Sequence, residues 1–166
     1  EIVTEFKGFR SVSDQYVLGN VQLRPGMNYN PAMVDQSIRM LYRTGQFEFV
    51  EVRVEPVDDD KVNVIYELVS KYTIQRIRFL GNDHYDDARL VSKAELETGL
   101  PLDEYLVSLG AEKIAEYYVE KGNPDVEVDY RIERDEYSGD ATVSYDIVEG
   151  GQVRIKEIIF EGNEAF

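Results

Sequence analysis

An internal repeat constrains this chain more than any other feature of its sequence. The phrase Ile-Arg-Phe-Leu-Gly-Asn at residues 77–82 returns as Ile-Ile-Phe-Glu-Gly-Asn at 158–163, and residues 3–8 are a looser copy. Each copy is a run of β-forming apolar residues stopped by glycine, which leaves a strand easily through positive φ. Self-similarity at a fixed period indicates a repeat array, here with two complete units and the beginning of a third.

The alignment of the two units continues well past this phrase. A shift of 73 residues, which takes Gly8 to Gly81, also takes Gly26 to Gly99. Further along, the second unit contains four residues more than the first, which is about one helical turn. We therefore predict a first repeat at residues 1–71, a second at 72–150, and the first strand of a truncated third at 151–166, with that strand at 153–160.

Local signals predict the order of elements within a unit. Asn30 followed by Pro31 is typical of a helix start, and Gly45 of a helix end. The apolar residues from Val50 to Val54 then alternate with charged ones, and alternation resumes after an acidic turn, which predicts a β-hairpin. With one earlier strand, each unit reads β-α-α-β-β.

These elements predict an α+β fold of tandem repeats. Each repeat has a three-stranded mixed sheet covered by two helices, because the first strand reaches its place through the helical pair and such crossovers favour parallel pairing. The third strand is then central and the second is an edge. We expect a helix in the second unit to run from Asp86 or Asp87 to about Glu97. Side chains expected to face the core include Tyr42, Phe47, Phe49, Leu106, Tyr117 and Tyr130.

The composition excludes several functions. The net charge of −15 argues against nucleic acid and anionic membrane surfaces as partners. The chain has no cysteine and a single histidine, His84 in a predicted loop, so no catalytic site, no metal site and no cofactor or small-molecule site is predicted. No apolar run approaches the ~20 residues of a membrane-spanning helix.

Three stretches resemble a known family. The segment Ile38–Val52, which reads IRMLYRTGQFEFVEV, resembles the junction between the second helix and second strand of a POTRA domain in outer-membrane protein assembly factors. Residues 79–82 and 147–150 resemble the opening and closing phrases of the next POTRA domain, and 158–166 the opening of a third.

The resemblance implies a non-catalytic periplasmic scaffold that assembles β-barrel proteins into the outer membrane. Its partners would be unfolded outer-membrane proteins, accessory assembly lipoproteins and a covalently attached membrane β-barrel. The alternatives are the POTRA region of a two-partner secretion transporter and a purely structural spacer.

The predicted edge strands are candidate sites for polypeptide binding. An extended segment that joins a sheet edge is held by backbone hydrogen bonds and therefore tolerates many sequences. The residues expected to form this site are Val50, Val52 and Val54 in the first unit and Val126, Val128 and Tyr130 in the second. The alternative is that charged neighbours, namely Glu51, Arg53, Glu127 and Asp129, only protect these edges from pairing.

Overall fold

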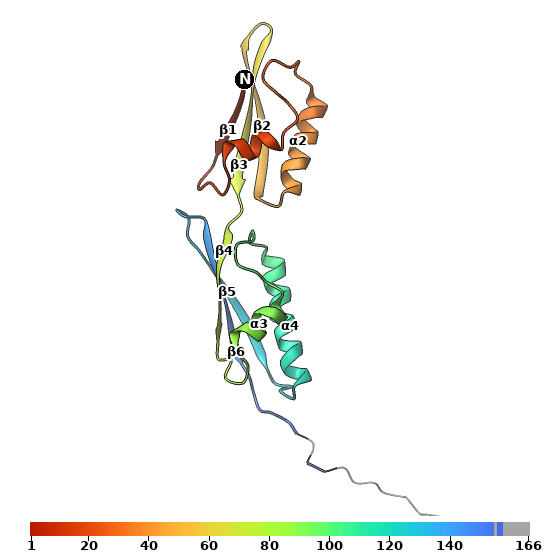
Figure 1. The fold of residues 1–166 in the computed structure, drawn as a ribbon, viewed down its shortest axis with the longest axis vertical. Coiled ribbons are helices and arrows are strands. Elements are labelled where there is room, and N and C mark those ends of the chain that lie inside the picture. The colour runs from red at the N-terminus through yellow and green to blue at the C-terminus, as the bar shows by residue number, and fades with distance from the viewer. Residues whose placement is uncertain (155, 158–166) are drawn as a thin grey trace, which may run out of the picture. The chain divides into compact units, whose positions relative to one another are not determined.

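Two successions of strand, helix, helix, strand and strand follow one another in the computed structural model (Figure 1), which describes residues 1–154 and 156–157. The first comprises β1 (Ile2–Phe6), α1 (Asp14–Gly19), α2 (Pro31–Arg43), β2 (Phe47–Asp58) and β3 (Lys61–Ser70). The second comprises β4 (Thr73–Leu80), α3 (Asp87–Ala94), α4 (Glu104–Glu120), β5 (Glu127–Arg134) and β6 (Asp140–Val148). The predicted β-α-α-β-β order is confirmed, whereas the strand predicted at 153–160 extends outside the described residues.

Each unit contains one three-stranded sheet. The strand order is β1-β3-β2 in the first and β4-β6-β5 in the second, so the third strand is central in both, as predicted. In the first sheet β3 pairs parallel with β1 and antiparallel with β2. The helices lie on one face of their own sheet (Figure 1). Because β3 and β6 are central, β2 and β5 lie at sheet edges.

The helix boundaries follow local chemistry. The side chain of Asn30 accepts a hydrogen bond from the Ala32 N–H at 2.9 Å, and Pro31 occupies the first position of α2. Asp86 caps α3 by accepting from the Arg89 N–H at 2.8 Å. That helix ends at Ala94, before the predicted Glu97, because Glu95 adopts the left-handed conformation with φ of 54°.

The core of the first unit lies between the helices and the sheet. Leu41 of α2 and Tyr66 and Leu68 of β3 have no exposed surface. Tyr42 follows Leu41, and a step of one residue turns a helical side chain by about 100°. Tyr42 therefore points to the rim of the sheet and is 42% exposed. The prediction that Tyr42 is buried is wrong for this reason.

Three other predicted core residues are also exposed, and the predicted burial of two is confirmed. Tyr117 and Phe47 are buried as expected. Leu106 is 46% exposed because the next residue, Val107, takes the inward position of α4. The remaining exceptions are Phe49 and Tyr130, which lie on β2 and β5. Phe49 lies on the open face of the sheet, because the register shifts between Phe47 and Phe49 and Val50 takes the inward position. Tyr130 lies on an edge strand, where side chains are covered from one side only.

In the second unit a glycine lets α4 approach the sheet closely. The Tyr145 hydroxyl donates to the Val107 carbonyl oxygen at 2.9 Å, which joins β6 to α4 within the core. A Cβ on Gly110 would lie 2.5 Å from the Tyr145 hydroxyl oxygen and 3.2 Å from the Ala94 carbonyl oxygen. Only glycine fits this position without a shift of its neighbours.

The repeated phrase that opens each unit has its own structural reason. Gly81, which ends β4, has φ of 82°, and a Cβ there would lie 2.1 Å from the Ile147 carbonyl oxygen. The following Asn82 donates through its side-chain amide to the Tyr85 carbonyl oxygen at 2.8 Å and to Asp87 at 2.9 Å. Glycine allows the sharp exit from the strand, and asparagine holds the loop that leads to α3. The predicted positive φ at Gly81 is confirmed.

Candidate functional site

The edge strand β2 turns a defined set of backbone groups away from the sheet. Val50 pairs with Leu68, Val52 with Tyr66 and Val54 with Val64. The Leu68 carbonyl oxygen accepts from Lys7 N–H at 2.9 Å, and the Val64 N–H donates to the Glu1 carbonyl oxygen at 2.8 Å. These residues of β3 therefore direct their backbone groups toward β1. In an antiparallel ladder their partners on β2 then direct theirs outward. The three valines predicted on β2 are thus the residues with outward-facing N–H and C=O groups.

One of these groups is already occupied. The Val50 N–H donates to the hydroxyl oxygen of Tyr42 at 3.0 Å, so the last turn of α2 covers the edge at this residue. At the other end Pro56, the next outward position after Val54, has no N–H to offer. The outward N–H groups of Val52 and Val54 lie between these two limits. The part of the chain that the structure describes provides no hydrogen-bond acceptor for either.

The two faces of β2 have different chemistry. Val50 is buried and Val52 half-buried on the face that the helices cover. On the opposite face Glu51 and Glu5 flank Glu67 in one row across the sheet. Arg53 makes ion pairs with Glu5 at 3.4 Å, with Glu55 at 2.9 Å and with Glu67 at 3.3 Å. These charged side chains lie on the open face of the sheet, not in the plane of the edge.

This open face carries a negative charge. The carboxylates of Glu5, Glu51, Glu55 and Glu67 lie on this face together with two cationic side chains, Lys7 and Arg53. Four negative and two positive charges leave a net charge of −2. A hydrogen bond from the Lys7 ammonium, followed by the charges of Lys7 and Arg53, lowers the pKa of Glu67 against a smaller opposing effect of burial. Glu67 therefore stays ionised at neutral pH.

The second edge, β5, has a similar arrangement. The strand begins at Glu127, so the predicted site residue Val126 lies just before it. The Asp135 N–H donates to the Asp140 carbonyl oxygen at 2.9 Å across the hairpin. On a regular strand the even-numbered residues then turn their N–H groups outward. Val128, which is half-buried, and Tyr130, which is 38% exposed, are therefore the edge positions of β5.

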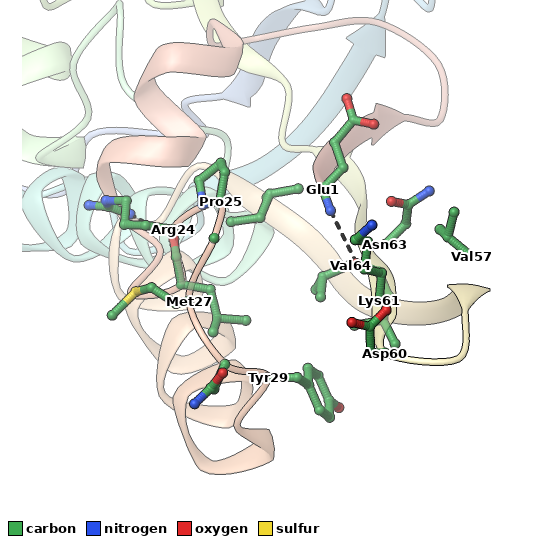
Figure 2. Close-up of a pocket in the computed structure, with 15 residues that line it drawn as sticks. Glu1, Arg24, Pro25, Met27, Tyr29, Val57, Asp60, Lys61, Asn63 and Val64 are labelled. Atoms are coloured by element: carbon green, nitrogen blue, oxygen red, sulfur yellow. Dashed lines mark hydrogen bonds between the residues drawn. The ribbon is translucent and has the colours of Figure 1, made fainter.

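A cavity of about 580 Å³ lies where the loop before α2 meets the β2–β3 hairpin. Figure 2 shows Met27 and Tyr29 on one side and Asp60 and Lys61 on the other. The Arg24 guanidinium in its wall donates to the carbonyl oxygens of Leu18 at 3.1 Å and Leu23 at 3.0 Å. The cavity thus combines apolar side chains with charges of both signs. Its lining residues form no arrangement typical of a catalytic or ligand-binding site.

The single histidine, whose side chain is exposed, contacts a buried carboxylate of the second unit, and together with Tyr118 they form a polar cluster. Glu149 accepts hydrogen bonds from the His84 N–H at 2.9 Å and the Tyr118 hydroxyl at 2.8 Å, and its other oxygen contacts Nδ1 of His84. Burial alone would raise the pKa of Glu149, but the bonds from His84 and Tyr118 and the charge of His84 together lower the pKa below its ordinary value. This cluster joins the loop after β4 to α4 and to the end of β6.

The described residues also contain no group of three or more His, Cys, Asp and Glu side chains that could hold a metal ion. Within the same residues none of the helices is long and apolar enough to span a membrane.

The sequence and the fold match known proteins over nearly the whole chain. The chain is 26% identical over 156 residues to an outer membrane protein assembly factor BamA of Nitratidesulfovibrio vulgaris, covering 94% of this chain and 20% of that protein. It is 25% identical over 169 residues to the BamA of Buchnera aphidicola, covering 98% of this chain and 26% of that protein. The chain therefore spans about a fifth to a quarter of the length of these relatives.

Structural comparison points to the same fold. The N-terminal domain of Omp85 from Thermosynechococcus elongatus superposes with a TM-score of 0.51 at 19% identity, covering 89% of this chain and 61% of that one. The model of the POTRA family, described as surface antigen variable number repeat, matches residues 4–71 and 72–150. Because these matches take in most of the sequence, the chain belongs to the POTRA family.

Proposed function

We propose that this chain is a non-catalytic scaffold that binds extended polypeptide by strand addition to the edges β2 and β5. The observation that supports this most directly is the pair of outward N–H groups at Val52 and Val54, which have no acceptor among the described residues. An incoming strand would supply carbonyl oxygens to these donors. The neighbouring charges of Glu51 and Arg53 lie on the sheet face and leave this edge open, which favours binding over simple protection.

The two faces of β2 suggest which segments it accepts. Side chains of an added strand alternate between the two faces of the sheet. On one face they would meet Val52, Val54 and the ring of Tyr42, and on the other a surface with two more carboxylates than cations. The preferred ligand is therefore an extended segment in which apolar residues alternate with polar or basic ones. Strands of membrane β-barrels alternate in this way.

The relatives supply the setting for this activity. Two curated relatives are named outer membrane protein assembly factors, so we place this chain in the periplasm as part of an outer-membrane protein. Its clients would be unfolded outer-membrane proteins, with accessory lipoproteins and an attached membrane β-barrel as further partners. Domain boundaries at residues 71 and 150, with a third domain beginning at 151, belong to the same proposal.

A proline scan of the β2 edge tests strand addition. Val54→Pro removes one outward donor without breaking a bond to β3, and Pro56 shows that this edge tolerates proline at an outward position. Val54→Ala is the matched control, because it shortens the side chain and keeps the N–H. Amide chemical shifts are followed while an alternating apolar and basic peptide is titrated into each protein.

We expect the peptide to shift the amides of residues 50–56 and to bind Val54→Pro about fivefold more weakly than Val54→Ala, since one hydrogen bond contributes about 1 kcal/mol. Equal affinity for the two variants would rule out β2 as the binding edge. Absence of shifts at both β2 and β5 would favour the purely structural spacer.

A further inference from the structure

We infer that Tyr42 is a register stop for strand addition in the first repeat. Its hydroxyl oxygen, 3.0 Å from the Val50 nitrogen, lies where the carbonyl oxygen of an added strand would have to be. A segment that joins β2 can therefore bond to the N–H groups of Val52 and Val54 but not to that of Val50. This inference rests on the proposed function and adds to it a residue that determines the length and register of the bound segment.

The stop is built from a short and well-defined connection. Tyr42 lies in the last turn of α2, and the chain reverses through Gly45, which has φ of 72°. The Gln46 N–H donates to the Thr44 side chain at 3.3 Å, and the Lys71 N–H donates to the Gln46 carbonyl oxygen at 2.9 Å. These bonds fix the start of β2 relative to the end of α2. The phenol is thereby held at the strand edge although Tyr42 is 42% exposed.

The edge that remains open is short and unequal in donors and acceptors. The outward N–H groups available to a ligand are those of Val52 and Val54, because Tyr42 occupies that of Val50 and Pro56 has none. The outward carbonyl groups of all four residues point the same way. A ligand therefore needs two carbonyl oxygens at alternate residues to bond to the N–H groups of Val52 and Val54. A longer ligand that also reaches Val50 forms no bond to the Val50 N–H. The site recognises a short extended segment in a single register.

A bond with a purely structural role would behave differently. In that case Tyr42→Phe would change the stability of the first repeat and leave the register of a bound strand unchanged. A register stop predicts that Tyr42→Phe lengthens the ladder by one hydrogen bond. Peptide length is the variable that separates these cases.

The experiment uses two peptides and three proteins. The short peptide spans the positions opposite Val52 and Val54, and the long one carries two more residues at each end. Each is titrated into the wild type, Tyr42→Phe and Tyr16→Phe, where Tyr16 is an exposed tyrosine of the same repeat on α1. Amide shifts and hydrogen exchange at Val50, Val52 and Val54 are recorded, and thermal melting is measured to compare stability.

We expect the ratio of long-peptide to short-peptide affinity to be the same for the wild type and Tyr16→Phe, with protection of Val52 and Val54 on binding and no change at Val50. In Tyr42→Phe the free protein exchanges its Val50 amide faster, this affinity ratio rises about fivefold, and the long peptide protects Val50. If the long peptide protects Val50 to the same degree in the wild type and in Tyr42→Phe, the stop is refuted while strand addition stands. If neither peptide affects Val52 or Val54 in any protein, strand addition at β2 is refuted, and the stop with it.

Discussion

The hydroxyl of Tyr118 donates to Oε1 of Glu149 at 2.8 Å, and both side chains are buried. A carboxylate at this depth is costly unless hydrogen bonds satisfy it. His84 supplies two further contacts, one from its backbone N–H at 2.9 Å and one from its ring. Tyr118 lies on α4, Glu149 directly follows β6 and His84 lies in the loop after β4, so the cluster closes one end of the second unit.

Removing the charge of this cluster should change how stability depends on pH. Hydrogen bonds and the charge of His84 overcome burial and lower the pKa of Glu149 in the folded chain below the ordinary value of 4.5. A lowered pKa stabilises the fold above that value, and the contribution is lost as pH falls through the folded pKa. Glu149→Gln should therefore unfold more easily at pH 7, and its deficit should shrink toward pH 3.

The expected loss at pH 7 is about 1.5–3 kcal/mol, the usual contribution of hydrogen bonds to a charged group. Urea unfolding of the wild type and Glu149→Gln at several pH values measures it, with Glu133→Gln on β5 as an exposed control. A deficit that stays constant from pH 7 to pH 3 would contradict a role for the ionised carboxylate.

Adding a methyl group at Gly110 should destabilise the second unit. Alanine favours helix by up to ~1 kcal/mol over glycine, but overpacking a core costs about 1–3 kcal/mol. The crowding dominates here, because the Tyr145 hydroxyl is held by the Val107 carbonyl oxygen and the Ala94 contact is backbone. We expect Gly110→Ala to lower the urea midpoint of unfolding. Gly19→Ala, whose Cβ would meet no atom within 4 Å, serves as the control.

A second substitution checks this cause. Tyr145→Phe removes the oxygen that lies 2.5 Å from the added Cβ, so Gly110→Ala should cost less in that background. Additive effects of the two substitutions would show that the crowding lies elsewhere.

The second edge can be tested with its own proline. Val128 turns its N–H outward on a regular β5, so Val128→Pro should leave the hairpin folded and weaken peptide binding at residues 127–134 by about fivefold. Val128→Ala retains the N–H and is the control. Amide shifts that persist along β5 in Val128→Pro would exclude this donor from the site.

Much of the fold follows from short-range signals. The start of α2 at Asn30 and Pro31 and the exit from β4 at Gly81 depend on the conformational preferences of single residues, which the sequence displays directly. Strand alternation also predicted the hairpin that β2 forms with β3. Such features need no knowledge of distant contacts, and so sequence was sufficient to predict them.

The remaining features depend on contacts between distant parts of the chain. Periodicity assigned Tyr42 to the core. Instead, the Tyr42 hydroxyl oxygen accepts a hydrogen bond from the Val50 N–H at the edge strand β2. His84 looked like an isolated loop residue because its partner, Glu149, lies 65 residues later. Neither pairing leaves a local pattern. The segment Ile38–Val52 indicated the junction in which Tyr42 lies, but it did not indicate the hydrogen bond from the Val50 N–H to the Tyr42 hydroxyl.

The hydrogen bond of Tyr42 also bears on how long a client would stay bound at the proposed site. An edge with two available N–H donors forms few bonds to a ligand, and at about 1 kcal/mol each these give a complex that dissociates quickly. A second edge on the same chain raises the chance of rapid recapture without making either complex long-lived. Under the proposed function, such a scaffold would retain a polypeptide by repeated brief encounters and release it without an energy source.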